Sequence, residues 1–372
     1  MGKNSVRHRL DGRRLFVFIG ALVVFGLILL NYSLLMKNTN AEGLKNNEDR
    51  PPPSKESNLA IVTAFSENHK LEGVAMLRSL IAVQFKGPVY IFLMKQSGED
   101  TYWITEFKEE LSKSPLLLRM IDFEVSSDSL DRGTYCFKPT AMGVFLRQNS
   151  RLLPHVVMWS DASTRFLQNP SLWANIIIQH EIDFVGRKEV WSIPQQTHSG
   201  TFEYFGLDPQ NYHDHPPIAG THFMVNLQRE QILSVLNKWV DCGVLDCHTC
   251  MAPIGSSKND PNGSTYTEGG NEYVSHRQDQ SVLTLLVTNY MKNFSTKANV
   301  KIIGDREEGG SSTTLVEAPY FCLVTRRHRG DIQSVRDWNK TFNIPATACD
   351  IRKSTILKYQ RNNTIMWEDE TL

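Results

Sequence analysis

The sequence predicts an α/β fold in which a mostly parallel, twisted sheet is flanked by helices, preceded by one transmembrane helix. Two observations carry this prediction. Downstream of residue 58, segments with strand character alternate with helical segments, which is typical of a parallel sheet covered by helices. Upstream, residues 15–36 form an uncharged apolar segment. The part after residue 58 has about 310 residues, which suits one large domain better than two.

Residues 15–36 are long enough to cross the hydrocarbon core of a membrane, which needs about 20 residues. Residues 1–14 carry five Lys and Arg residues against one acid, Asp11. The positive-inside rule therefore keeps 1–14 in the cytosol as a tail and places the rest in the lumen. A cleaved signal peptide is the alternative, but the apolar run is long and no convincing cleavage site follows it. We expect a single-pass type II membrane protein of the secretory pathway, with a polar stem over 37–58.

Asn-x-Ser/Thr sequons, the acceptor motifs for N-glycosylation, fit a luminal location for the chain beyond the membrane. They occur at Asn262, Asn293, Asn339 and Asn362. The chain has 40 basic and 40 acidic residues and a formal net charge of +0. A nucleic-acid binder needs a net basic face, so nucleic acid is not an expected partner.

All six cysteines lie past the membrane segment, and disulfides are the default for such a set in an oxidising lumen. They are Cys136, Cys242, Cys247, Cys250, Cys322 and Cys349. Zinc binding by the cluster over 242–250 is the alternative, but no second cysteine pair accompanies it. The connectivity stays open, because six cysteines allow fifteen pairings.

Apolar patterning gives the order of the elements in the luminal domain, which we expect to span 59–330 and to be followed by an extension over 331–372. Strands are predicted at 59–65, 89–94, 116–125, 155–160, 184–185 and 221–226. Helices are predicted over 71–85, 100–113, 135–148, 171–179, 228–240 and 279–291. The segments 188–218 and 242–270 are predicted to be long loops.

Asp161 follows directly on the buried strand predicted at 155–160. In an open α/β sheet, ligands bind at the carboxyl ends of the strands. A carboxylate at that place can hold a divalent cation, and the cation can hold a diphosphate. The alternative is that Asp161 only caps the turn that follows it.

Several common motifs are absent, namely the dinucleotide Gly-x-Gly-x-x-Gly after the first strand, the P-loop, Gly-x-Ser-x-Gly and His-Glu-x-x-His. Four other segments are present: 135–140 (Tyr-Cys-Phe-Lys-Pro-Thr), 159–165 (Trp-Ser-Asp-Ala-Ser-Thr-Arg), 219–226 (Ala-Gly-Thr-His-Phe-Met-Val-Asn) and 276–281 (His-Arg-Gln-Asp-Gln-Ser). In this order they resemble the GT-A class of glycosyltransferases, and more narrowly a branch of type II membrane proteins with a Trp-x-Asp-Ala-Ser motif. The resemblance implies a fold of the nucleotide-diphospho-sugar transferase type.

The resemblance implies that Asp161 and Ser163 stand where such enzymes carry Asp-x-Asp, a motif that binds Mn²⁺ or Mg²⁺. The cation bridges the diphosphate of a nucleotide sugar and stabilises the charge that develops on it. Ser163 replaces the second acid, so the cation is held less tightly or is replaced by side-chain cations. His328 is a further candidate metal ligand, against the alternative of a basic surface run.

Side-chain cations that can bind the diphosphate are Lys138, Arg165 and Arg277, and the alternative for each is solvated surface charge. Asp279 is the candidate catalytic base that deprotonates an acceptor hydroxyl. An acid in the first turn of a helix also stabilises the helix by itself, which is the alternative for Asp279.

The first strand and the turn after it are expected to meet the base and ribose of the nucleotide, by analogy with the fold. The residues concerned are Val62, Thr63, Ala64 and Asn68. The expected function is transfer of a sugar from a nucleotide-sugar donor to a hydroxyl of a glycan or glycoprotein in the secretory pathway. One alternative is a catalytically inactive glycan-binding or adhesion domain on the same scaffold, suggested by Ser163. Another is a luminal metal hydrolase, which needs several carboxylates and histidines around Asp161.

Overall fold

The computed structural model describes most of the chain between residues 58 and 326. The described ranges are 58–96, 101–125, 135–150, 153–166, 168–189, 191–253, 276–295, 297–303, 313–318 and 321–326. The predicted cytosolic tail, the membrane segment over 15–36 and the extension over 331–372 lie outside these ranges. Within them, every helix is too short or too polar to span a bilayer.

The core of the fold is a seven-stranded sheet in the order β3-β2-β1-β4-β7-β6-β8. Only β7 runs against the other strands of this sheet, so the prediction of a mostly parallel sheet is confirmed. The strands are β1 (Leu59–Phe65), β2 (Pro88–Gln96), β3 (Leu117–Val125), β4 (Val156–Ser160), β6 (Phe184–Lys188), β7 (Ile218–Asn226) and β8 (Val300–Ile303).

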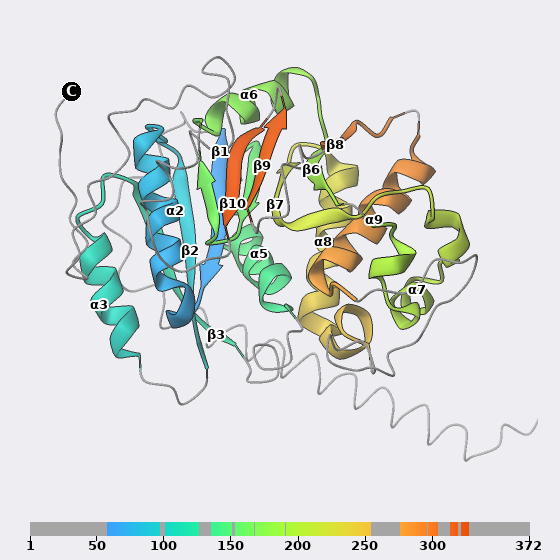
Figure 1. Ribbon diagram of the computed structural model, residues 1–372, viewed down its shortest axis with the longest axis horizontal. Coiled ribbons are helices and arrows are strands. Elements are labelled where there is room, and N and C mark those ends of the chain that lie inside the picture. The colour runs from blue at the N-terminus through green and yellow to red at the C-terminus, as the bar shows by residue number, and fades with distance from the viewer. Residues whose placement is uncertain are drawn as a thin grey trace, which may run out of the picture. The chain divides into compact units, whose positions relative to one another are not determined.

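Helices cover both faces of this sheet, as Figure 1 shows with α2 and α3 on one side and α8 and α9 on the other. All residues of β1 and β4 are buried, because a strand covered on both faces needs apolar side chains without alternation. Alternate side chains of each strand enter two different cores, one with α2, α3 and α6 and one with α5, α8 and α9. The helices are α2 (Lys70–Ala82), α3 (Tyr102–Leu111), α5 (Phe137–Gln148), α6 (Ser171–Gln179), α7 (Ser199–Phe205), α8 (Glu230–Leu245) and α9 (Asp279–Asn293).

The segment over 188–218 is not the long loop that its polar composition predicts. It contains α7, and two short helical turns, η2 (Pro194–Gln196) and η3 (Pro209–Tyr212), flank this helix. The ring of His198 caps α7 by accepting a hydrogen bond from the backbone of Gly200. Phe202 and Tyr212 then pack into a small separate core. Buried aromatic side chains thus hold this segment in place, although its overall composition is polar.

The start of the second predicted loop, over 242–270, is also helical. Helix α8 extends to Leu245, and a helical turn, η4 (Cys247–Met251), follows it. Residues 254–270 of this predicted loop lie outside the described residues. Two disulfides hold the described part.

A second, three-stranded sheet joins the chain near Asp161 to its late part. It consists of β5 (Thr164–Phe166), β10 (Phe321–Arg326) and β9 (Thr313–Ala318), in that order and antiparallel. Thr164 pairs with Thr325, so the strand that ends two residues before His328 lies beside the strand that follows the Asp161 turn. His328 itself lies outside the described residues.

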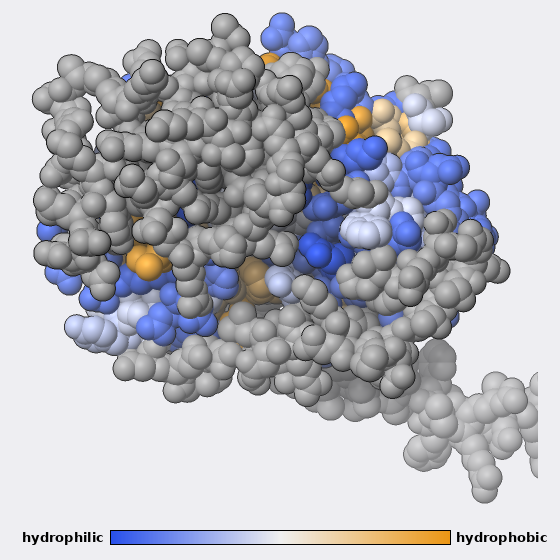
Figure 2. All heavy atoms as spheres, viewed as in Figure 1, coloured by the Kyte–Doolittle hydropathy of each residue, from blue (hydrophilic) through white to orange (hydrophobic). Residues whose placement is uncertain are grey.

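The face of the molecule in Figure 2 has a largely hydrophilic surface where its atoms are coloured. Hydrophobic atoms appear there as small separate spots among hydrophilic ones. On this face, the coloured atoms therefore form no broad apolar patch of the kind that marks an interaction surface.

Candidate functional site

The turn at Asp161 is held firmly at the end of β4. The indole Nε1 of Trp159, which is buried in the core, donates a hydrogen bond to Oδ1 of Asp161 at 2.8 Å. The backbone N–H of Asp161 donates to the carbonyl of Thr221 in β7, also at 2.8 Å. The side chain of Asp161 remains 25% exposed. The prediction that this acid sits at the carboxyl end of a buried strand is therefore confirmed.

Lys138, in the first turn of α5, is the centre of a cluster that it forms with Asp161 and Asp279. Its ammonium nitrogen lies 3.0 and 3.1 Å from the two carboxylate oxygens of Asp161 and 3.0 Å from the carbonyl oxygen of Gly220 in β7. It also lies 3.4 Å from Oδ2 of Asp279, the first residue of α9. The ammonium group belongs to one of the four motifs and contacts one residue from each of the other three, namely Asp161, Gly220 and Asp279. With one cation and two acids, this cluster has a net charge of −1 when all three side chains are ionised.

Asp279 is packed more tightly than Asp161, with a side chain only 6% exposed. The indole of Trp239 donates to the backbone carbonyl of Asp279 at 2.9 Å. A Cβ atom on Gly220 would lie 2.9 Å from Oδ2 of Asp279, closer than side chains normally approach. Gly220 is therefore the residue that leaves room for this carboxylate.

The electrostatics of the cluster follow from its burial. Burial raises the pKa of Asp279 to about 6; Lys138 opposes this shift and Asp161 adds to it. Burial alone lowers the pKa of Lys138, but the carboxylates of Asp161 and Asp279 outweigh it, so this pKa is raised. Lys138 therefore stays charged at neutral pH, while Asp279 is a stronger base than an ordinary aspartate.

The Asp-Gln-Ser motif fixes the start of α9 to its surroundings. Oε1 of Gln280 accepts from the backbone N–H of Gly220 at 3.3 Å, and its Nε2 donates to Oε1 of Gln196 at 3.2 Å. The hydroxyl of Ser281 donates to the carbonyl of Gln196 and accepts from the backbone N–H of Arg277. Gln280 and Ser281 are thus positioning residues for Asp279.

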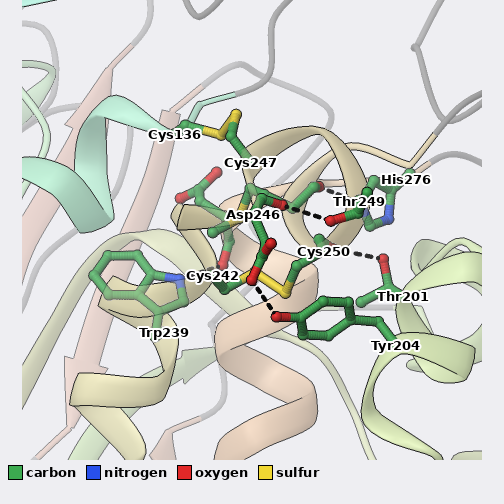
Figure 3. The surroundings of a disulfide bond; sticks show 12 residues. Cys136, Thr201, Tyr204, Trp239, Cys242, Asp246, Cys247, Thr249, Cys250 and His276 are labelled. Carbon is green, nitrogen blue, oxygen red and sulfur yellow. Dashed lines mark hydrogen bonds between the residues drawn. A yellow bond between two sulfur atoms is a disulfide. The ribbon is translucent and has the colours of Figure 1, made fainter. Parts of the chain in front are cut away.

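Two disulfides hold the region around Lys138, and Figure 3 shows their surroundings. Cys136, two residues before Lys138, is bonded to Cys247, and Cys242 is bonded to Cys250. The preference for disulfides over zinc is therefore confirmed for these four cysteines. A Cβ atom on Gly243 in α8 would lie 2.2 Å from Cγ of Pro139, so α5 and α8 pack in close contact beside the disulfides.

The other predicted site residues that the structure describes lie on β1 and in the turn after it, close to Asp161 in the sequence, and just before α9. Val62, Thr63 and Ala64 are buried in β1, and Asn68 is exposed in the helical turn η1 (Glu67–His69). The guanidinium of Arg165 donates to the carbonyls of Ala162 and Thr164 at 2.9 and 2.8 Å. Ser163 and Arg277 are half-buried beside Asp161 and Asp279 in the sequence.

The sequence did not reveal the roles of three residues of the site, namely Trp159, Gly220 and Gln280, although the strand that begins at Gly220 was expected to flank the sugar or acceptor. Trp159 and Gln280 were read only as parts of motifs, because an indole and an amide have no charge that marks them. The signal for Gly220 was its place at the start of a predicted strand, where a glycine weakens the strand unless something approaches closely.

Binding of a divalent cation at Asp161 depends on which other side chains near it can act as metal ligands. Among the residues that the structure describes, no group of three or more His, Cys, Asp or Glu side chains is arranged to hold a metal ion. Mg²⁺ and similar cations are commonly bound by one or two carboxylates plus phosphate oxygens of the substrate. Asp161 supplies one partly exposed carboxylate and Ser163, two residues on, supplies a hydroxyl, a donor set that fits such a substrate-completed site.

No protein-family model and no curated protein matches the sequence. Solved structures to which the chain is similar include core-mannan synthase A from Aspergillus fumigatus in its Mn/GDP form, with 9% identity over 64% of this chain and 71% of that chain, and a TM-score of 0.37. The galactosyltransferase LgtC, in complex with donor and acceptor sugar analogs, shows 13% identity over 66% and 73% of the two chains, with a TM-score of 0.35. Mouse xyloside xylosyltransferase 1, in its apo form, shows 10% identity over 66% and 84%, with a TM-score of 0.33.

Proposed function

We propose that this protein is a glycosyltransferase that moves a sugar from a nucleotide-sugar donor to a hydroxyl of a glycan or glycoprotein acceptor. The observation that carries the proposal is the convergence of Asp161, Lys138 and Asp279 at the carboxyl end of β4. These residues come from separate motifs that resemble GT-A glycosyltransferases. Their contacts bring residues of these separate motifs together in one site.

Asp161 is the proposed contact with the donor, because its carboxylate is the most accessible of the three charged groups. Lys138 and Trp159 fix the orientation of this carboxylate. When bound, Mn²⁺ or Mg²⁺, held by Asp161 and Ser163 together with the diphosphate, supplies positive charge for the leaving diphosphate. The net charge of −1 on the cluster favours a cation there.

Asp279 is the proposed general base. In the transfer, the acceptor hydroxyl oxygen forms a bond to the anomeric carbon of the donor sugar. The bond from that carbon to the diphosphate oxygen breaks, and its electron pair leaves with the diphosphate. Asp279 takes the hydroxyl proton, and a pKa of about 6 keeps it ionised at neutral pH while making it more basic than usual.

The carboxyl end of β1 is the proposed contact for the nucleotide. Val62 pairs with Trp159, so β1 ends beside the strand that leads to Asp161. We propose that Val62, Thr63 and Ala64 in β1 and Asn68 in the turn after it contact the base and ribose of the nucleotide. Arg165, Arg277 and His328 are proposed to act on the diphosphate and its cation.

The proposed location is the Golgi membrane, in a type II orientation that rests on the apolar segment over 15–36 and its basic flank. Protease protection on intact vesicles tests this orientation. Protection of a C-terminal tag is expected, and cleavage of that tag without detergent contradicts the type II orientation.

The experiment for the activity is a transfer and hydrolysis assay on the full chain, with a panel of nucleotide sugars and Mn²⁺. Asp161→Asn is expected to lower the rate of turnover at least about a hundredfold, because it weakens the hold on the cation that would offset the charge of the leaving diphosphate. Asp122→Asn is the matched control, since Asp122 is exposed on β3, at the far edge of the sheet from the site. Equal rates for Asp161→Asn and wild type contradict the proposed site.

The second candidate function is an inactive glycan-binding domain on the same scaffold, favoured by Ser163 in place of a second acid. This candidate predicts glycan binding without nucleotide binding and without turnover for any donor. Nucleoside diphosphate binding by the wild-type chain therefore separates the two functions.

A further inference from the structure

Tyr135 is an exposed aromatic residue at the edge of the cluster. The ammonium nitrogen of Lys138 lies 5.6 Å from the centre of the Tyr135 ring and 5.9 Å from the ring of Trp159. The two rings differ in their surroundings, because Trp159 is fully buried while Tyr135 is 44% exposed. Trp159 is therefore part of the core, whereas Tyr135 is partly accessible to a ligand that binds near Lys138.

The backbone of Tyr135 is in the left-handed region, with φ of 54°. In the described part of the chain, the other non-glycine residues with positive φ are Gln84, Glu181 and Gln278. Gln84 and Glu181 each follow the C-cap residue of a helix, α2 and α6 respectively, where this conformation is ordinary. Tyr135 and Gln278 instead come just before α5 and α9, the helices that carry Lys138 and Asp279. Strain of this kind is concentrated at functional sites.

The ring of Tyr135 is carried on a segment that is held in place. The next residue, Cys136, is buried and bonded to Cys247. The backbone N–H of Lys138 donates to the carbonyl of Tyr135 at 3.2 Å, which closes a tight turn. An exposed aromatic side chain on a fixed backbone binds a ligand with little loss of conformational entropy.

We propose that Tyr135 is a specificity-determining residue whose ring stacks on a pyranose ring at the reacting end of the site. A pyranose has a face of C–H groups and an edge of hydroxyl groups, so an aromatic ring beside a carboxylate matches both. Tyr135 lies close to Lys138 and Asp161, and the diphosphate separates the nucleobase from that end of the donor. This inference rests on the proposed function for the place of the donor.

Two variants separate the ring from the backbone. Tyr135→Phe keeps the ring, whereas Tyr135→Gly removes it and still accepts a positive φ without strain. Gln84→Gly is the matched control, because it makes the same backbone change at a helix end outside the cluster. Thermal unfolding of the full chain is expected to show that all three variants remain folded.

Binding is measured by calorimetry and by saturation-transfer NMR on the full chain with Mn²⁺. The probes are UDP and GDP, the UDP- and GDP-sugars, and the methyl glycosides of common hexoses and xylose. Tyr135→Gly is expected to weaken the binding of nucleotide sugars or of methyl glycosides about five- to tenfold. Tyr135→Phe and Gln84→Gly are expected to bind as wild type does, and UDP and GDP are expected to bind all proteins alike.

A loss confined to the nucleotide sugars assigns the stacked pyranose to the donor, and a loss confined to the methyl glycosides assigns it to the acceptor. Unchanged sugar binding by Tyr135→Gly overturns the inference but leaves the proposed function intact if UDP or GDP binds. Weaker binding of UDP or GDP themselves also overturns it, because the ring then meets the nucleobase. Glycoside binding that needs the ring, without any nucleotide binding, supports the stacking and contradicts the proposed function. Absence of binding to every probe contradicts both.

Discussion

The ammonium group of Lys138 lies between the carboxylates of Asp161 and Asp279, 3.0 Å from an oxygen of the first and 3.4 Å from an oxygen of the second. This contact joins the end of a central strand to the starts of two helices from distant parts of the chain. The more exposed acid is left facing solvent, and the more buried acid becomes basic. The same three groups therefore determine both the local stability and the proposed chemistry.

Lys138→Met is expected to destabilise the fold by about 3 kcal/mol, because it leaves two acids near each other without their buried counterion. Urea denaturation at pH 8 measures the change. The double variant Lys138→Met with Asp279→Asn is expected to recover part of the loss, since it removes the more buried charge. If both variants unfold at the same urea concentration, Asp279 and Lys138 are not coupled as described.

Asp279→Asn is expected to abolish most turnover while raising stability at alkaline pH. The folded pKa of Asp279, about 6, is above its ordinary value of 3.8. Protonated Asp279 therefore contributes about 3 kcal/mol to the free energy of unfolding below pH 3.8, and this contribution is lost as the pH rises through 6. Relative to wild type, Asp279→Asn should gain stability between pH 4 and pH 8, as measured by urea denaturation across this range. If the difference in free energy of unfolding between Asp279→Asn and wild type does not change with pH, this contradicts the raised pKa of Asp279.

Wild-type turnover is expected to rise with pH through about 6, because only ionised Asp279 accepts the proton. A pH profile of kcat/KM on the best donor measures this rise. Asp122→Asn is expected to keep the same acidic limb. An acidic limb that persists in the residual activity of Asp279→Asn assigns the base to another group.

Loss of the Cys136–Cys247 disulfide is expected to harm the protein more than loss of Cys242–Cys250. The first joins residues 111 apart and the second joins residues 8 apart, so loop-closure entropy gives about 4–5 and about 2–3 kcal/mol. The first also anchors the turn that precedes Lys138. Paired Cys→Ser variants, compared by thermal unfolding and by nucleotide binding, test this order. Equal losses of nucleotide binding speak against a role of Cys136–Cys247 in positioning Lys138.

Gln84→Gly is expected to stabilise the fold by about 0.5–1 kcal/mol, because Gln84 has φ of 56° just after the end of α2. Its side chain is exposed, so the substitution removes strain without removing packing. Urea denaturation measures the gain. A loss of stability indicates that the side chain of Gln84 makes a contact more favourable than the strain.

Much of the fold was predictable because local patterns and long-range packing agree. The unbroken apolar strands over 59–65 and 155–160 are the ones covered by helices on both faces. The loop predicted over 188–218 was wrong, since α7 depends on a small core that α9 completes through Leu285. The pairing of β5 with β10 joins segments that no local pattern connects.

For the site, the sequence indicated which charged residues matter but not their mutual contacts. Lys138, Asp161 and Asp279 were each marked by a motif, whereas their convergence depends on strand order and on the glycine at 220. Tyr135 was marked only as the first residue of the motif over 135–140, because its exposure and its left-handed backbone appear only in three dimensions.

Calorimetric titration of UDP and GDP into the full chain tests the central claim most directly, with and without Mn²⁺ and with wild type beside Asp161→Ala. The account predicts Mn²⁺-dependent binding to wild type and a loss of at least about tenfold in affinity for Asp161→Ala. Equal affinities of the two proteins would contradict it and remove Asp161 from the centre of the site.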